Sequence, residues 1–206
     1  MVRIANPGSI GWAFVTCAAV AMFVAAVTPA AAADVDAGRR KAERCAACHG
    51  HDGNATVPGT PSLAGMGAFY THWQLIMFRD GRRRDSQMTP FVQNLTDEDL
   101  GDLSAYYAAQ TPRSRAAATN SSRAAAGRPL ALSNHCTSCH GPALMGQLQI
   151  PRLAGQDLDY LVKRLRGYKA KTTSDLDGMM TMVAQSLSDE DVENLVHFLA
   201  SMPAER

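Results

Sequence analysis

The chain has 206 residues, a length that allows one large domain or two small ones. Its formal charge of +1 gives no strong overall field, which argues against nucleic acid as a partner. Hydrophobic residues make up 46% and charged residues 19%, which is typical of folded proteins, but aromatic residues reach only 6%. If the chain forms two small domains, we expect something other than aromatic side chains to fill their centres.

The N-terminus has the layout of a secretory signal peptide. Arg3 provides a positive start, residues 10–27 form an uncharged apolar run, and residues 28–33 are small and end in an Ala-x-Ala pattern. We predict a signal peptide over residues 1–33, cleaved before Asp34, which places the rest of the chain in an oxidising compartment. The apolar run approaches the length of a membrane span, so an uncleaved N-terminal anchor stays open as an alternative.

Three separated motifs occur twice at nearly constant spacing. The sequences at residues 45–49, 61–65 and 95–99 return at offsets of 91, 90 and 92 residues. This constancy predicts tandem domains of similar size. The predicted segments are a first domain over 34–111, an Ala-, Ser- and Arg-rich linker over 112–126, and a second domain over 127–206.

The opening and middle segments of both domains are expected to be helical. The first helix covers about residues 38–48, and its counterpart opens near Pro129, a residue that suits a first helical turn. A middle helix is predicted over about residues 68–79, with its partner over about 158–168. No alternating apolar run of strand length stands out, so the predicted fold class is all-α.

The last helix of each domain begins at a capping signal. Thr96 and Ser188 each precede an acidic run with Asp three residues on, a pattern that resembles a capping box. The positive end of the helix dipole explains these carboxylates, so we assign them no chemistry. The apolar stripes of the two helices recur at i, i+3 and i+7: Leu100, Leu103 and Tyr107 in the first domain, and Val192, Leu195 and Leu199 in the second.

A Cys-x-x-Cys-His motif occurs in each domain and predicts covalent haem attachment. On a helix the two sulfurs and the imidazole project from the same side, so thioether bonds can hold the porphyrin edge while histidine reaches the iron. Zinc, a redox dithiol and a disulfide are the alternatives. The sequence therefore predicts two covalently bound haem c groups, with these attachment and ligand residues: Cys45, Cys48 and His49, then Cys136, Cys139 and His140.

A haem would also supply what the composition lacks. A domain of about 80 residues buries little apolar surface and usually needs a staple. We therefore expect haem to be part of each folding unit, with the helices packed around it.

The sixth iron ligand decides between an electron carrier and a catalyst. Methionine is the expected ligand, because its soft thioether favours ferrous iron and raises the reduction potential. Met88 and Met180 lie seven residues before the repeated Leu of the last helix, at an offset of 92, so the repeat selects them. Met179 and Met182 flank Met180 and would replace it after a register shift. The remaining histidines have no counterpart in the other half and are predicted to be surface or packing residues: His51, His72, His135 and His197.

Several motifs together support a family resemblance: the haem motif with its Gly at 45–50, Asp-Gly-Asn at 52–54, the Pro-x-Leu-Ala-Gly turns at 61–65 and 151–155, Tyr70 and Tyr160, and the Leu-Thr/Ser-Asp-Glu-Asp helix starts. The mature chain resembles the two-haem class I cytochromes c of the cytochrome c4 family. The resemblance implies two cytochrome c domains related by a pseudo-twofold axis and His/Met iron in both. It also suggests the carbonyls of Pro61 and Pro151 as acceptors for the two iron-binding imidazoles. One departure is Met66 in the first turn, where the second turn keeps Gln156.

We accordingly predict a periplasmic electron carrier rather than an enzyme. It would accept electrons from a quinol-oxidising cytochrome complex or a dehydrogenase and pass them to a terminal oxidase or reductase. A monomer is expected, and peripheral association with a membrane stays open. The alternatives are a dihaem electron-transfer subunit of a heteromeric enzyme, such as a sulfide-oxidising flavocytochrome, and a dihaem peroxidase, which would need an accessible iron.

Arg82, Arg83 and Arg84 form the one compact basic run of the sequence. A solvated surface is the simplest interpretation. The sharper hypothesis is that these arginines steer a redox partner or neutralise haem carboxylates.

Overall fold

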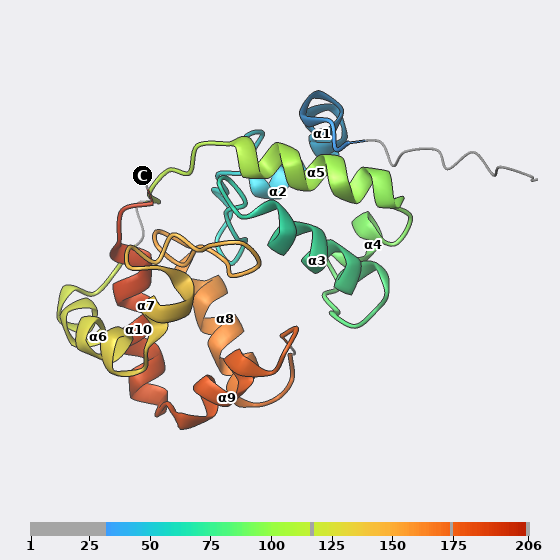
Figure 1. Cartoon of the computed structure of the whole chain (residues 1–206). Coiled ribbons are helices and arrows are strands. Elements are labelled where there is room, and N and C mark those ends of the chain that lie inside the picture. The colour runs from blue at the N-terminus through green and yellow to red at the C-terminus, as the bar shows by residue number, and fades with distance from the viewer. Residues whose placement is uncertain (1–31, 116–117, 174, 205–206) are drawn as a thin grey trace, which may run out of the picture. The chain divides into compact units, whose positions relative to one another are not determined.

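Every regular element of the described residues is a helix, which confirms the all-α prediction. The computed structural model describes residues 32–115, 118–173 and 175–204, and the predicted signal peptide lies outside them except for its last two residues. Among the described residues, no helix is long and apolar enough to cross a membrane. The helices shown in Figure 1 are α1 (Val35–Ala42), the 3₁₀ turn η1 (Glu43–Cys45), α2 (Ala46–His49), α3 (Ala68–Arg79), α4 (Thr89–Val92), α5 (Asp97–Ala109), α6 (Ser121–Ser133), α7 (Cys136–His140), α8 (Leu158–Lys169), α9 (Met179–Ser186) and α10 (Asp189–Ser201).

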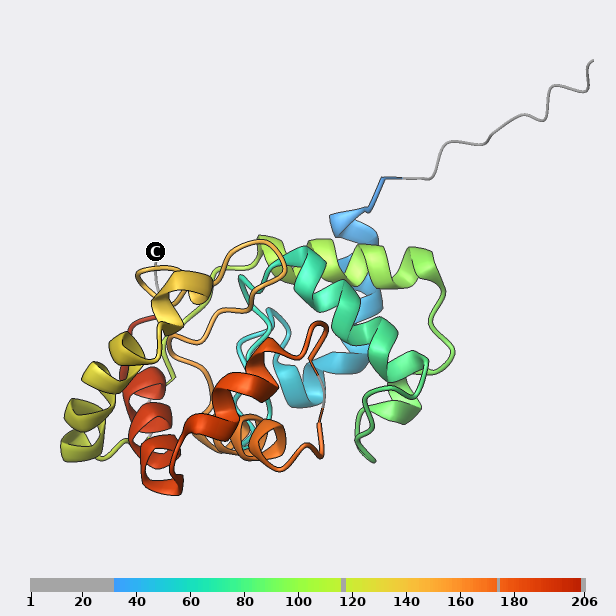
Figure 2. The same cartoon turned by 60° about the horizontal axis from the view of Figure 1, so that its bottom comes forward.

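In the first half, α1 crosses α5 at a glycine (Figure 2). A β-carbon on Gly38 would lie 2.1 Å from the carbonyl oxygen of Asp102 and 2.7 Å from Cβ of Tyr106, so only glycine allows this approach. Asp34 caps α1 by accepting N–H groups of its first turn. The crossing fixes the direction in which the chain enters η1 and α2, where the first haem motif lies.

The second half repeats the crossing with α6 and α10, but α6 begins earlier than expected. Asn120 caps the helix, whose first residue is Ser121, so helix occupies part of the predicted linker. Pro129 lies inside α6 and not in its first turn, so that prediction was wrong. The sequence hid this helix because its contact surface is small: a β-carbon on Gly127 would lie 2.1 Å from the carbonyl oxygen of Asn194, where larger side chains cannot fit.

The last helix of each half begins as predicted. Thr96 and Asp99 form a reciprocal capping box on α5, and Ser188 and Asp191 form the same box on α10. The predicted stripes are buried in both halves and form the centres of the cores: Leu100, Leu103 and Tyr107, and Val192, Leu195 and Leu199.

The two halves contact each other through the turns that follow the haem motifs. The side-chain amide of Gln156 accepts the N–H of Ser62 at 2.8 Å and donates to its carbonyl at 3.0 Å. Asp157 accepts the N–H of Gly59 at 3.0 Å and pairs with Arg115 at 2.6 Å. The departure between the two repeats therefore has a structural reason: Gln156 makes a contact between the halves that a methionine cannot make.

Candidate haem sites

Each Cys-x-x-Cys-His motif lies on a short helix at the end of the opening segment. In both motifs the first cysteine is half-buried and the second is exposed, as Cys45 and Cys48 show in the first half. The four described cysteines form no disulfide, and no third metal-binding side chain joins either motif within the described residues. The disulfide and zinc alternatives therefore find no support in the geometry.

The two motif histidines are held in the orientation that an iron ligand needs. His49 is 5% exposed and His140 is 4% exposed. Their Nδ1 atoms lie 2.9 Å from the carbonyl oxygen of Pro61 and 2.8 Å from that of Pro151, and because a carbonyl only accepts, each Nδ1 carries the proton. Burial lowers the pKa of both imidazoles, which keeps them neutral. Each Nε2 lone pair is thus free to bind a metal, and both carbonyls are those that the resemblance suggested.

Both histidines line a cavity of about 560 Å³ whose wall is mainly apolar. Met88 and Met180 lie on the same wall, together with Cys45 and Cys48. The neighbours of Met180 point elsewhere, since Met179 is 48% exposed and Met182 is 60% exposed. The structure therefore brings one repeat-selected methionine to the cavity for each motif histidine.

Three arginines along this cavity have no carboxylate partner within the described residues. Arg152 is buried, its Nε has no hydrogen-bond partner, and its other contacts are the carbonyls of Ala154 and Ala64. Arg83 donates to the hydroxyl of Tyr160, and Arg164 donates to Thr173 and Tyr168. Burial lowers the pKa of Arg152 to about 10, which still leaves it charged at neutral pH.

Buried cations need an anion close by. A haem is a largely apolar plate with two carboxylates, so the apolar wall, the free imidazoles and these guanidinium groups all fit it. Cys45, Cys48 and His49 would hold one haem, and Cys136, Cys139 and His140 the other. The unpaired arginines would lie near the carboxylates.

The Arg82–Arg84 run does not act as one surface. Arg83 turns inward to Gln74 and Tyr160, whereas Arg82 stacks on the ring of Trp73 and pairs with Asp80. Arg84 is exposed. Only Arg83 is thus placed to meet a haem carboxylate, and two arginines remain for the surface.

Sequence reasoning missed Arg152 and Gln156, although both lie in or directly after the Pro-x-Leu-Ala-Gly turn. The available signal was the difference between the repeats, because the first turn has Ser62 and Met66 at the matching positions. A polar residue on one side of a repeat and an apolar residue on the other indicates a contact that the repeat does not share.

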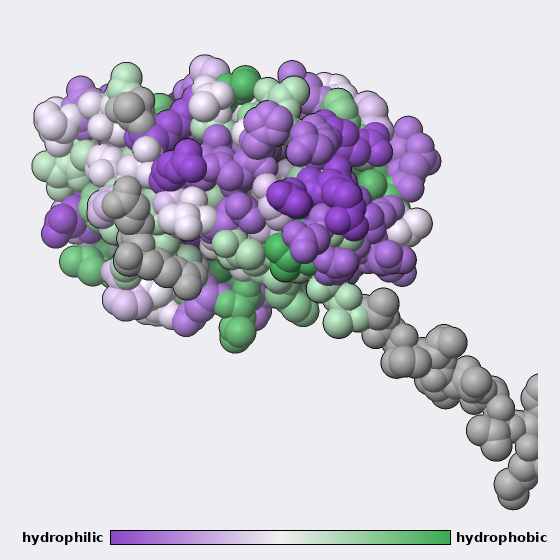
Figure 3. Space-filling model, turned by 90° about the horizontal axis from the view of Figure 1, so that it is seen from above, coloured by the Kyte–Doolittle hydropathy of each residue, from purple (hydrophilic) through white to green (hydrophobic). Residues whose placement is uncertain are grey.

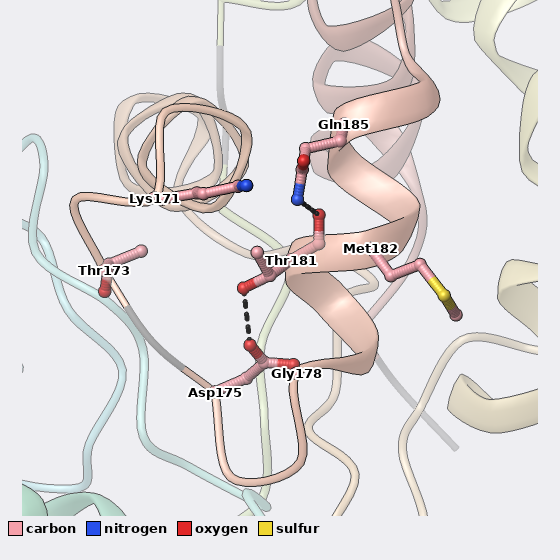
Figure 4. Close-up of a pocket in the computed structure, with 7 residues that line it drawn as sticks. All are labelled: Lys171, Thr173, Asp175, Gly178, Thr181, Met182 and Gln185. Atoms are coloured by element: carbon pink, nitrogen blue, oxygen red, sulfur yellow. Dashed lines mark hydrogen bonds between the residues drawn. The ribbon is translucent and has the colours of Figure 1, made fainter.

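A second hollow, of about 450 Å³, opens beside α9 (Figure 4). Asp175 accepts a hydrogen bond from the hydroxyl of Thr181 at 2.7 Å, and the sulfur of Met182 is directed away from Asp175. We assign no ligand to this open hollow. Its lining residues are Lys171, Thr173, Asp175, Gly178, Thr181, Met182 and Gln185.

The helical halves and their motif histidines define a c-type cytochrome with two haem domains. Residues 124–203 match the family model described as cytochrome c, and residues 33–106 match the one described as cytochrome C oxidase, cbb3-type, subunit III. Cytochrome c4 of Pseudomonas aeruginosa is 35% identical over 186 residues, which cover 84% of this chain and 90% of that protein. The crystal structure of reduced recombinant cytochrome c4 from Pseudomonas stutzeri superposes with a TM-score of 0.77 at 31% identity, over 83% of this chain and 100% of that one.

The chain belongs to the cytochrome c4 family, as the sequence resemblance indicated. It carries two covalently bound haem c groups and transfers electrons. A further relative is the thiosulfate dehydrogenase electron acceptor of Stutzerimonas stutzeri, which is 35% identical over 170 residues, covering 77% of this chain and 78% of that protein.

Proposed function

We propose that the protein is a periplasmic carrier in which Met88 and Met180 complete the coordination of the two haem irons opposite His49 and His140. The observation that carries this proposal is that each repeat-selected methionine lines the same cavity as the motif histidines. Iron with two protein ligands has no position left for a substrate, which favours electron transfer over catalysis.

Haem iron, when bound, supplies a one-electron couple. The chain contributes the environment of that couple. The proline carbonyls fix the tautomer and direction of His49 and His140, and the buried arginines offset negative charge that would otherwise stabilise ferric iron. Because Cys48 and Cys139 are exposed, the attached edge of each haem lies close to the surface, where electrons can reach a partner.

For partners, we propose that a dehydrogenase or a quinol-oxidising cytochrome complex donates electrons and that a terminal oxidase or reductase accepts them. A dehydrogenase donor gains support from the relative described as a thiosulfate dehydrogenase electron acceptor. We propose a signal peptide over residues 1–33, cleaved on export, and a monomeric mature protein.

The test of the coordination compares four single substitutions in the haem-loaded protein. Met88→Ala and Met180→Ala should each remove about half of the weak sulfur-to-iron absorption in the near infrared and lower the reduction potential of one haem. Met179→Ala and Met182→Ala are matched controls and should leave the band unchanged. A control that removes the band would reassign the ligand, and carbon monoxide binding to the reduced wild type would refute closed coordination.

A second candidate, a haem subunit bound permanently to a catalytic subunit, is favoured by one surface. Residues 129–151 contain no Lys, Arg, Asp or Glu, and within them Leu132 and Leu148 are exposed. Figure 3 shows hydrophilic residues gathered on the side of α1 and α5, with paler and more apolar residues on the side of α6 and α7. Elution of the native protein at about its own mass of 22.0 kDa supports the carrier, whereas constant co-purification with a flavoprotein supports the subunit.

A further inference from the structure

A carboxylate holds each of the two methionine-bearing turns. In the first half, Asp85 Oδ1 accepts the N–H of Gln87 at 3.0 Å and that of Met88 at 3.3 Å. In the second half, Asp175 accepts the N–H of Met180 at 2.6 Å. The two aspartates lie 90 residues apart, in register with the repeat.

The two aspartates differ in what their carboxylates contact beyond the turn. Asp85 Oδ2 lies 2.7 Å from Nζ of Lys163, which belongs to α8 of the other half. Within the described residues, the carboxylate of Asp175 contacts only Met180 and Thr181 of its own turn. The side chain of Asp85 is 21% exposed, so the carboxylate end of this ion pair is shielded from water on most sides.

This arrangement gives the first turn a dependence on the second half. Met88 precedes α4, which has only four residues and cannot maintain its own geometry. The bonds from Asp85 to the turn are charge-assisted, so they contribute more than neutral hydrogen bonds do. They also require the carboxylate to hold one orientation, and Lys163 fixes that orientation by binding the second oxygen.

We propose that Asp85 is a positioning residue for the sulfur of Met88, and that Lys163 makes this positioning depend on the contact between the two halves. Met180 is positioned without such a link. The inference rests on the proposed ligand role of Met88. Its consequence is that a loosened contact between the halves weakens the iron–sulfur bond of the first haem and leaves the second unchanged.

The experiment uses the haem-loaded protein and measures how fast imidazole displaces methionine from ferric iron. A Met180→His background leaves the first haem as the one with a sulfur ligand, and a Met88→His background leaves the second. Lys163→Gln should accelerate displacement about two- to fivefold in the first background, the range expected for losing one partly exposed ion pair, and should have no effect in the second. Lys169→Gln is the matched control, because Lys169 lies on the same helix and pairs with Asp189 at 2.5 Å, away from both turns.

A salt titration gives a second measurement that needs no ligand substitution. Raising the ionic strength should accelerate imidazole binding at one haem of the wild type, and Lys163→Gln should abolish that dependence. Equal acceleration at both haems, or none at either, would overturn the inference while the ligand assignment stands. If Met88→His alone leaves the sulfur band intact, the proposed ligand itself is wrong.

Discussion

The crossing of α1 and α5 offers the sharpest test of how the first half is packed. In Gly38→Ala, the new β-carbon would lie 2.1 Å from the carbonyl oxygen of Asp102, whereas ordinary contact begins at 3.4 Å. The helices must therefore separate by about 1.3 Å, or the backbone must bend, because a helical carbonyl cannot rotate away. Overpacking of this kind costs about 1–3 kcal/mol, and with backbone as the obstacle we take the upper end. Alanine regains at most about 1 kcal/mol of helix propensity, which leaves roughly 2 kcal/mol of net destabilisation.

The assay is thermal unfolding of the haem-loaded protein followed by far-ultraviolet circular dichroism. For a cooperative unit of this size, the expected fall in Tm is roughly 4–8 °C. Gly101→Ala on α5 is the control, because its β-carbon would meet only Cβ of Ala33 at an ordinary 3.7 Å. That substitution should raise the stability by up to about 1 kcal/mol. Equal Tm values for the two variants would refute the packing argument.

Two further predictions concern the contact between the halves and the behaviour in acid. Gln156→Ala leaves the N–H and carbonyl of buried Ser62 without partners and should lower the free energy of unfolding by about 2–4 kcal/mol in guanidinium titrations; a loss below about 1 kcal/mol would contradict this. The hydrogen bond from Lys41 lowers the pKa of Asp99 from 3.8 to about 2, so its stabilising effect is complete above about pH 4 and is lost as the pH falls towards 2. Asp99→Asn should flatten the decline in stability over that interval, and an unchanged slope would assign acid sensitivity to other groups.

The haem motifs, the repeat and the helix caps could all be predicted because each depends on residues close together in sequence. Cys45, Cys48 and His49 carry their chemistry in their spacing. The box of Thr96 and Asp99 is a local exchange of hydrogen bonds within one turn. The repeat extended this reach, since comparing the halves selected one methionine in each without any structure.

The start of α6 could not be predicted, because the residues that stabilise it show no apolar periodicity. Its contact with α10 depends on the absence of a side chain at Gly127, and on the carbonyl of Asn194 that fills the space. A missing side chain leaves no hydrophobic signal. Pro129 then suggested a helix start at a position where the structure has the interior of a helix.

The sequence by itself determined the number of haems, their covalent attachment and the helices that surround them. Only the tertiary structure decided which polar residues join the halves: Gln156 with Ser62, and Asp85 with Lys163. The physical reason is the range of the interactions. Caps and attachment motifs act over a few residues and recur in both halves, whereas a pairing between the halves joins residues 78 to 94 positions apart and occurs once, so neither periodicity nor the repeat reveals it.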